Sequence, residues 1–384
     1  MAAVSDEPFA YVRRLPAERL PPPLAPTGAL GWLRANLFSS PANIALTLLC
    51  VLFIAWAIPP LVRFFLIDAV WSGADREACL ATPEHPAVGA CWAFVRVWFS
   101  YFVYGFYPAG QRWRVDLFFI ALAFGIVWLL RLSAPRRDLG ALYFFVVLPV
   151  LSFVLLHGAP PIGLAVVPTA LWGGMLVTVI VATVGIVFSL PLGILLALGR
   201  RSDLPVVRLL SVIFIEFVRG VPLITVLFMA SVMLPLFVPD AWSPDKLVRA
   251  LVGIAMFASA YMAEVVRAGL QAIPKGQFEG AMAVGLGFRQ MMRLIVLPQA
   301  LRITIPNIVN SYIGLFKDTS LVLIIGIFDF LHTIETARID PKWATPVTST
   351  TGYALAAMFY WICCYSMSRY ARNMEARLAK SDRR

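Results

Sequence analysis

The chain has 384 residues, of which 60% are hydrophobic and only 14% are charged. Soluble domains are about half apolar and a quarter charged, so this balance excludes an ordinary soluble protein and indicates lipid as the solvent. The net charge of +11 would suggest a nucleic-acid partner in a soluble protein, but lysines and arginines also collect in the cytoplasmic loops of membrane proteins. No basic stretch carries a nucleic-acid recognition motif, so nucleic-acid binding is not expected.

The first 43 residues are rich in proline and arginine and lack a cleavage site after a short apolar core. We therefore predict a disordered cytoplasmic tail over 1–43 rather than a removable signal peptide. A three-span extension is expected over 44–160, with a periplasmic loop at about 68–114. Cys79 and Cys91 lie in this loop, where a disulfide is permissible if the loop is periplasmic.

A membrane-spanning helix needs about 20 apolar residues. This length predicts an all-α, polytopic transmembrane protein of about eight spans, at residues 44–67, 115–132, 140–158, 171–198, 207–238, 250–272, 305–330 and 352–370. The aromatic segment 92–107 contains Arg96 and is interpreted as an interfacial helix rather than a ninth span. The 207–238 stretch is too long for one straight crossing, so its first part is expected to lie along the interface, with bends at Pro222 and Pro235.

Both termini are predicted to lie in the cytoplasm. This orientation puts most of the 32 lysines and arginines in cytoplasmic regions, as the positive-inside rule requires. Between the sixth and seventh spans it places a cytoplasmic loop at 273–303, whose apolar residues recur at helical spacing. Gly285 and Gly287 interrupt the pattern, and Pro298 is expected to stop it. Two short helices joined at a flexible corner would suit docking on another protein.

Charged side chains inside spans are costly and are functional candidates by default. Two Glu-x-x-Arg pairs place an acid and a base one turn apart on a shared helical face, either to neutralise each other or to shape a gate. A third group, near the middle of a span, predicts a broken helix that lines a water-filled path. The translocation-pathway or gate candidates are Glu216, Arg219, Glu264, Arg267, Lys317, Asp318, Thr319 and Ser320.

The cytoplasmic loop resembles the EAA motif of ABC importer permeases, which reads Glu-Ala-Ala, three residues, Gly, nine residues, Ile, one residue, Leu-Pro. The matching residues are Glu279, Gly280, Ala281, Gly285, Ile295, Leu297 and Pro298, with Gly280 in place of the first alanine. The resemblance implies that this loop couples the chain to a separate ATPase. It also implies that Glu279 contacts the ATPase, that Gly285 forms the turn, and that Leu297 and Pro298 end the second helix.

Four further segments, EFVRGVPL, AEVVRAG, LPQA and KDTSL, look like successive marks of the polar amino-acid permeases. The resemblance covers 168–384 and implies a five-helix, type I (MetI-like) permease core. The three extra spans and the segment YPAGQRWRVDL resemble the longer permeases of general L-amino-acid importers or of acidic-amino-acid and amide importers. Such a subunit would carry L-amino acids from periplasm to cytoplasm across the bacterial inner membrane.

The partners that the resemblance implies are a second homologous permease, two ATP-binding subunits and a periplasmic amino-acid-binding protein. The binding protein would be received by the external loops 239–249 and 331–351. A membrane pocket near Lys317 or Asp318 is a further hypothesis, in which the two ends of an amino-acid zwitterion meet these charges.

The sequence contains no Gly-Lys dipeptide, so no Walker A loop can form and a partner must hydrolyse ATP. We predict no catalytic residues, no metal site and no cofactor, since the three histidines are far apart. One alternative is a secondary amino-acid transporter without an ATPase, which would be expected to have two repeated halves with broken helices in each. Another is a membrane anchor that recruits an enzyme without transport. The translocation-pathway or gate candidates all lie in the C-terminal two-thirds of the chain rather than in two repeated halves, which favours the importer over the secondary transporter.

Overall fold

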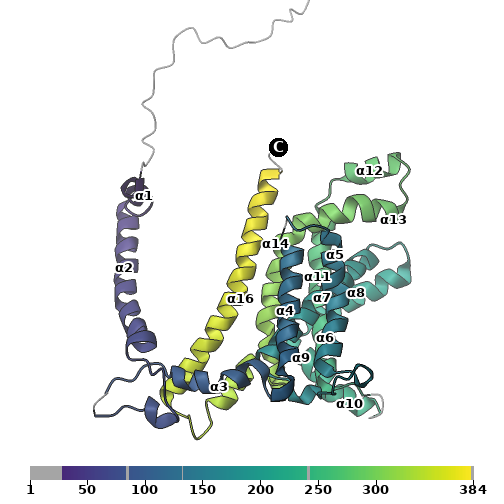
Figure 1. The fold of residues 1–384 in the computed structure, drawn as a ribbon. Helices are drawn as coiled ribbons and strands as arrows, with labels where there is room; N and C mark the ends of the chain where they lie inside the picture. Colours follow the sequence, from purple (N-terminus) through teal and green to yellow (C-terminus); the bar gives the residue numbers. More distant parts are fainter. Residues whose placement is uncertain (1–27, 84–85, 132, 240–242, 382–384) are drawn as a thin grey trace, which may run out of the picture. The chain divides into compact units, whose positions relative to one another are not determined.

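The computed structural model describes residues 28–83, 86–131, 133–239 and 243–381. These residues form helices and a few isolated β-bridges, which confirms the all-α prediction (Figure 1). The chain divides into two compact units, Met1–Ile67 and Asp68–Arg384. Most of the predicted tail, residues 1–27, and residues 240–242 of the predicted external loop 239–249 lie outside the described residues.

The first unit contains α1 (Gly28–Asn36) and α2 (Pro41–Val62), which a π-helical turn extends to Ile67. The Ser40 hydroxyl accepts a hydrogen bond from the Asn43 N–H at 3.2 Å and caps α2, whose first residue is Pro41. α2 is apolar on all sides and none of its residues is buried, which suits a helix surrounded by lipid. The prediction of a disordered tail is wrong for 28–36, where alanine, leucine and arginine favour a helix.

The second unit is a bundle of long helices with shorter helices at its two ends (Figure 1). Its helices are α3 (Trp92–Tyr104), α4 (Arg112–Leu130), α5 (Arg137–Leu142), α6 (Leu148–His157), α7 (Gly174–Arg200), α8 (Pro205–Gly220), α9 (Leu223–Phe228), α10 (Leu234–Phe237), α11 (Lys246–Gln271), α12 (Lys275–Ala283), α13 (Phe288–Met291), α14 (Leu297–Asp318), α15 (Phe330–Ala337) and α16 (Pro346–Ser381).

Within the described residues, six helical segments are long and apolar enough to cross a membrane, or up to seven if a sharply bent pair counts as one span. The six are Pro41–Ile67, Ala109–Leu130, Arg137–His157, Gly174–Arg200, Lys246–Gln271 and Phe288–Ile325. The predicted span at 352–370 lies inside the 36-residue helix α16, where tyrosines, serines and Arg369 make the helix less apolar than the others.

The bent pair is formed by α8 and the continuous helix Leu223–Phe237, which meet at 105°. The break falls at Val221 and Pro222, where the sequence predicts a bend. A bend of this size means that α8 and the helix Leu223–Phe237 cannot form one straight span. The chain does not break at the second predicted position, Pro235.

Three Leu-Pro pairs follow π-helical turns and leave their helices unbroken. In each case the leucine N–H donates to the carbonyl oxygen five residues earlier, as with Leu297 and Met292. A proline inside an α-helix lacks an N–H and clashes with the carbonyl of residue i−4. A wider π turn displaces that carbonyl, so the helix continues. The pairs are Leu148-Pro149, Leu234-Pro235 and Leu297-Pro298.

α3 has 13 residues and is too short for a membrane crossing, which takes about 20. Figure 1 shows it lying across the direction of the long helices, as an interfacial helix would. A disulfide between Cys79 and Cys91 closes the loop before it, with Cα atoms 5.8 Å apart. The Cys91 N–H donates to the Thr351 hydroxyl at 2.8 Å, which fastens this loop to the first turns of α16.

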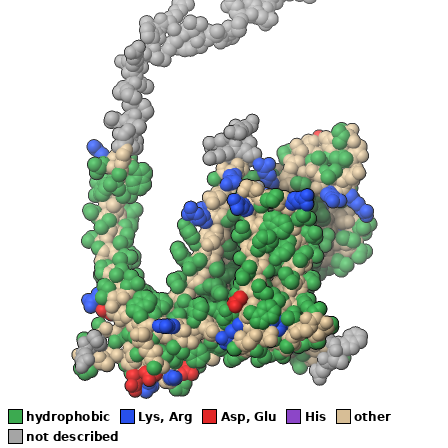
Figure 2. Space-filling model, in the orientation of Figure 1, with side chains coloured by type: hydrophobic (Ala, Val, Ile, Leu, Met, Phe, Trp, Pro, Cys, Tyr) green, Lys and Arg blue, Asp and Glu red, His purple; other side chains and the backbone are tan. Residues whose placement is uncertain are grey.

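Buried apolar side chains form three clusters in the second unit. The first joins α4, α6, α7 and α11, and the second joins α7 and α11 to the segment 273–303. The third packs α3 and the disulfide loop against α15 and α16. Figure 2 shows apolar side chains over the flanks of the bundle, and lysines and arginines gathered at the end that carries α12 and α13.

Candidate translocation and coupling site

The elbow, residues 273–303, is built from α12 and the first turns of a much longer helix. α12 ends at Ala283, and the chain turns at Gly285, whose φ of +78° lies in the left-handed region. Glycine adopts this conformation without steric cost, so the predicted corner is present at Gly285. The Leu286 N–H donates to the Ala281 carbonyl oxygen at 3.1 Å, which closes the end of α12 as in a Schellman motif.

The elbow exposes apolar side chains. Met282, Val284 and Phe288 are each more than half exposed, whereas Ala281 is buried against the bundle. Glu279 and Gly280 are exposed on α12. An exposed apolar patch with polar residues around it is typical of a protein-binding surface.

The second half of the elbow differs from the prediction. α13 continues through the π turn Met292–Val296 directly into α14, so the helix runs unbroken from Phe288 to Asp318. The expectation that Leu297 and Pro298 end a short second helix is therefore wrong, because the π turn accommodates the proline. Ile295 and Leu297 are half-buried and Pro298 is exposed. The elbow is thus one short helix joined by a turn to the end of a span.

Five charged side chains meet where α7, α8 and α11 approach one another; we call them the ion cluster. They are Arg200, Glu216, Arg219, Glu264 and Arg267. Arg200 Nη1 donates to Glu264 Oε1 at 2.9 Å and to Glu216 Oε1 at 2.8 Å. Glu264 Oε2 lies 2.7 Å from Arg267 Nη2 and 3.8 Å from Arg219 Nη1. Glu264 is therefore the centre of the cluster.

The two predicted Glu-x-x-Arg pairs differ in the structure. Glu264 and Arg267 form the pair within one helix, as their spacing predicts. Glu216 and Arg219 instead find their ion-pair partners on α7 and α11. Sequence reasoning missed Arg200, because an arginine at the end of a span reads as an ordinary cytoplasmic-loop cation. Only its contacts with two other helices reveal it.

The third polar group lies where α14 ends. At Asp318 the helix changes to a 3-10 helix that runs from Thr319 to Ile325, so a broken helix is present at the predicted position. The Thr319 hydroxyl donates to the Phe316 carbonyl oxygen at 2.8 Å, and the Ser320 hydroxyl donates to the Lys317 carbonyl oxygen at 3.0 Å. These hydroxyls satisfy carbonyl groups that the change of helix leaves free.

Lys317 and Asp318 line different hollows. Asp318 lines a pocket of about 310 Å³ among α7, α11 and α14, together with Ser189, Tyr261 and Tyr312. Lys317 lines a groove of about 330 Å³ beside α16. Successive residues of a helix point in directions about 100° apart, so neighbouring charges need not share a pocket. One amino acid therefore cannot meet both charges within either hollow, contrary to the hypothesis drawn from the sequence.

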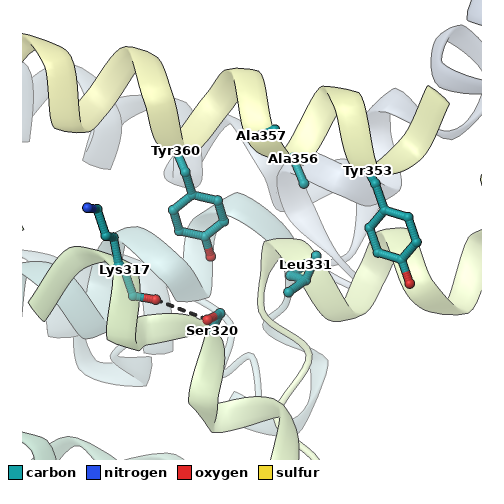
Figure 3. Close-up of a pocket in the computed structure, with 7 residues that line it drawn as sticks. All are labelled: Lys317, Ser320, Leu331, Tyr353, Ala356, Ala357 and Tyr360. Atoms are coloured by element: carbon teal, nitrogen blue, oxygen red, sulfur yellow. Dashed lines mark hydrogen bonds between the residues drawn. The ribbon is translucent and has the colours of Figure 1, made fainter. Parts of the chain in front are cut away.

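The groove beside Lys317 is mainly apolar. Figure 3 shows the rings of Tyr353 and Tyr360 projecting from α16 into it, with Leu331 and Ser320 on the opposite side. The Tyr360 hydroxyl lies 3.4 Å from Asp329 Oδ2, so its polar end is turned toward the start of α15. The Asp318 pocket is the more polar of the two hollows, since a carboxylate, serines and tyrosines line it.

The described spans, the broken helix and the exposed elbow define a multi-pass membrane permease. Residues 189–380 match the family model of the binding-protein-dependent transport system inner membrane component, and the chain belongs to this family.

Named relatives cover nearly the whole chain. It is 50% identical to the inner membrane amino-acid ABC transporter permease protein YhdY of Escherichia coli (strain K12), over 91% of this chain and 93% of the relative. It is 37% identical to the glutamate/glutamine/aspartate/asparagine transport system permease protein BztC of Rhodobacter capsulatus, over 99% of this chain and 100% of the relative. A crystal structure of an amino acid ABC transporter with histidines matches 53% of this chain and 92% of its own, at 25% identity and a TM-score of 0.47.

Proposed function

We propose that the chain is the transmembrane subunit of an ATP-driven ABC importer that carries L-amino acids from periplasm to cytoplasm. The observation that carries the proposal is the exposed elbow between two spans, which has the residue spacing of the EAA motif and an apolar, outward-facing surface. The relatives named above are amino-acid permeases, which supports the substrate class.

The end of the bundle that carries α12 would face the cytoplasm. Lysines and arginines gather at this end (Figure 2), in keeping with the positive-inside rule. α16 would form the last crossing and return the C-terminus to the cytoplasm. An odd number of added spans before the five-helix core would place the N-terminus there as well.

The elbow would bind a separate ATPase, which supplies the hydrolysis. Glu279 and the exposed apolar residues of the elbow would contact it, and Gly285 would hold the angle between α12 and the following span. A second homologous permease, two ATPase subunits and a periplasmic binding protein complete the proposed complex. The external segment 331–351 would form part of the surface that receives the binding protein.

Solute would pass the Asp318 pocket rather than the Lys317 groove. The pocket has the volume of a small-molecule site and combines a carboxylate with hydroxyl groups. Asp318 would attract the ammonium group of an amino acid, and the hydroxyls of Ser189 and Tyr261 can donate to its carboxylate.

Uptake in a deletion strain tests the function. A strain that lacks the chain should lose uptake of part of a panel of radiolabelled L-amino acids, and the purified protein should bring an ATPase with it. A secondary transporter would retain uptake without an ATPase, and a membrane anchor would bind an enzyme while uptake stayed unchanged. Uptake that persists after ATP depletion would contradict the proposal.

Two elbow variants test the coupling. Glu279→Arg and Gly285→Pro should abolish uptake and ATPase association while the protein still inserts, because one reverses the charge at the proposed contact and the other forbids the φ of +78°. Normal uptake in both variants would refute the assignment of the elbow.

A matched pair of charge removals tests the pocket. Asp318→Asn should change the substrate preference or lower the rate, while Lys317→Gln should change the preference less, because Lys317 lines the other hollow. An unchanged preference and rate in Asp318→Asn would place the substrate elsewhere.

A further inference from the structure

Arg201, the residue that follows α7, touches both parts that the elbow connects. Its guanidinium carbon lies 5.8 Å from the centre of the Phe278 ring on α12, and its Nη1 donates to the Leu270 carbonyl oxygen in the last turn of α11 at 3.5 Å. A guanidinium within about 6 Å of an aromatic face is attracted to it. Arg201 therefore links the α12 helix to the ends of two spans.

Its chain neighbour Arg200 belongs to the ion cluster. Because the two arginines are consecutive, a displacement of Arg201 moves the backbone that carries Arg200. Arg200 bridges Glu216 of α8 and Glu264 of α11 through a single nitrogen. At the end of α7, Arg201 therefore contacts the elbow and Arg200 contacts the ion cluster.

The ion cluster in turn contacts the Asp318 pocket. The guanidinium carbon of Arg219 lies 5.6 Å from the centre of the Tyr261 ring, and Tyr261 lines the pocket that contains Asp318. Side-chain contacts therefore link Phe278 on α12 to Arg201, and Arg200 to Glu264, Arg219 and Tyr261, and the backbone between Arg201 and Arg200 joins the two sets.

We propose that Arg201 is the positioning residue through which movement of α12 reaches the ion cluster and the Asp318 pocket. This inference rests on the proposed function. When the ATPase draws α12 away from the bundle, the Arg201–Phe278 contact pulls on the end of α7 and shifts Arg200 between its two glutamates. Arg201 would act through Phe278 and Arg200 rather than on the substrate itself.

The cluster is suited to such a response. The Glu264 side chain is 17% exposed and Arg200 is 27% exposed, so their contact is shielded from water, whereas Glu216 is 53% exposed. A shielded ion pair is sensitive to small displacements, because a separated charge there is incompletely solvated. An exposed pair is weak and is easily replaced by water.

The ratio of solute taken up to ATP hydrolysed tests the proposal. The complete complex, purified with its ATPase and reconstituted in vesicles with the binding protein, is supplied with a radiolabelled mixture of L-amino acids. Arg201→Ala should lower this ratio about tenfold, while the ATPase still co-purifies in normal amount. Arg201→Lys keeps a cation above the Phe278 ring and should retain a ratio within about threefold of wild type.

A double-mutant cycle separates transmission from simple stabilisation. Phe278→Leu should lower the ratio as Arg201→Ala does, and the double variant should be no worse than either single variant, because both remove one contact. Arg208→Ala, which removes an exposed arginine of α8 outside the cluster, should leave the ratio unchanged.

A normal ratio in Arg201→Ala would overturn the proposal, and so would additive losses in the double variant. Loss of the ATPase from the Arg201→Ala complex would assign the residue to docking and would also overturn it. If the wild-type complex showed no ATP-dependent uptake, the proposed function would fail instead, so the two failures are distinguishable.

Discussion

Gly105 and Gly173 lie in backbone contact. A Cβ atom added to Gly105 would collide with the backbone of Gly173, and Gly105 also has a φ of +60°. The contact joins the end of α3 to the residue before α7. The chain before α7 therefore approaches α3 closely because neither residue at the contact has a side chain.

Gly105→Ala should destabilise this junction by at least about 2 kcal/mol, because it adds a backbone clash to an unfavourable φ. The expected result is a lower melting temperature of the purified protein in detergent. Gly110→Ala is the matched control, since a Cβ there meets nothing within 4 Å. Equal melting temperatures for the two variants would show that the junction relaxes without cost.

Two glycines of the elbow should respond in opposite ways to alanine. Both have open space around the position of a Cβ, but Gly285 has a φ of +78° whereas Gly280 lies within α12. Gly280→Ala should stabilise α12 by up to about 1 kcal/mol and retain uptake. Gly285→Ala should cost about 1 kcal/mol and lower uptake.

Hydrogen exchange of the elbow, measured beside uptake, checks this pair. Protection of the α12 amides should rise in Gly280→Ala and fall in Gly285→Ala. Faster exchange in Gly280→Ala would mean that the glycine is needed for flexibility rather than tolerated.

Features that depend on local sequence could be predicted well. Runs of apolar residues located the spans, and a proline in an overlong run located the bend at Pro222. The glycine that turns the elbow was recognisable because few residues other than glycine adopt its φ. In each case the residues that determine the feature lie within a few positions of it in the sequence.

Features that depend on backbone bonding or distant contacts could not be predicted. A Leu-Pro pair ordinarily signals the end of a helix. The sequence contains no recognisable signal for the π turn that allows the helix to continue through Pro298. The role of Arg200 could not be predicted because its two partners, Glu216 of α8 and Glu264 of α11, are distant in the sequence. The separation of Lys317 from Asp318 depended on which helices pack on each side of α14.

The disulfide should stabilise the end of the bundle that carries α3. Cys79 and Cys91 are 12 residues apart, and closing a loop of about this length contributes roughly 3 kcal/mol. The double substitution Cys79→Ser with Cys91→Ser should therefore lower the melting temperature, and a reductant should lower that of the wild type to the same value. Cys50→Ser, which removes an exposed cysteine of the first unit, serves as the control. A melting temperature insensitive to reductant would contradict this prediction.

Asp329 should make the stability depend on pH. Its side chain is buried just before α15, where its carboxylate oxygens accept the N–H groups of Leu331 and His332, each at 3.1 Å. Burial raises the pKa of Asp329 from 3.8 to about 6, although these hydrogen bonds lower it. The folded protein therefore binds this proton more tightly than the unfolded chain does.

The contribution of Asp329 to the free energy of unfolding should be complete below about pH 4 and should be lost as the pH rises through about 6. The loss amounts to at most about 3 kcal/mol, since each pKa unit corresponds to about 1.4 kcal/mol. Asp329→Asn keeps an oxygen to cap α15 but cannot ionise, so its melting temperature should lack this decline and should exceed that of the wild type at pH 7.5. Asp340→Asn, which alters a half-exposed acid that also accepts a backbone N–H, should retain the decline. Melting curves of the three proteins from about pH 4.5 to 7.5 decide the matter, and parallel curves for the wild type and Asp329→Asn would mean that another group sets the pH dependence.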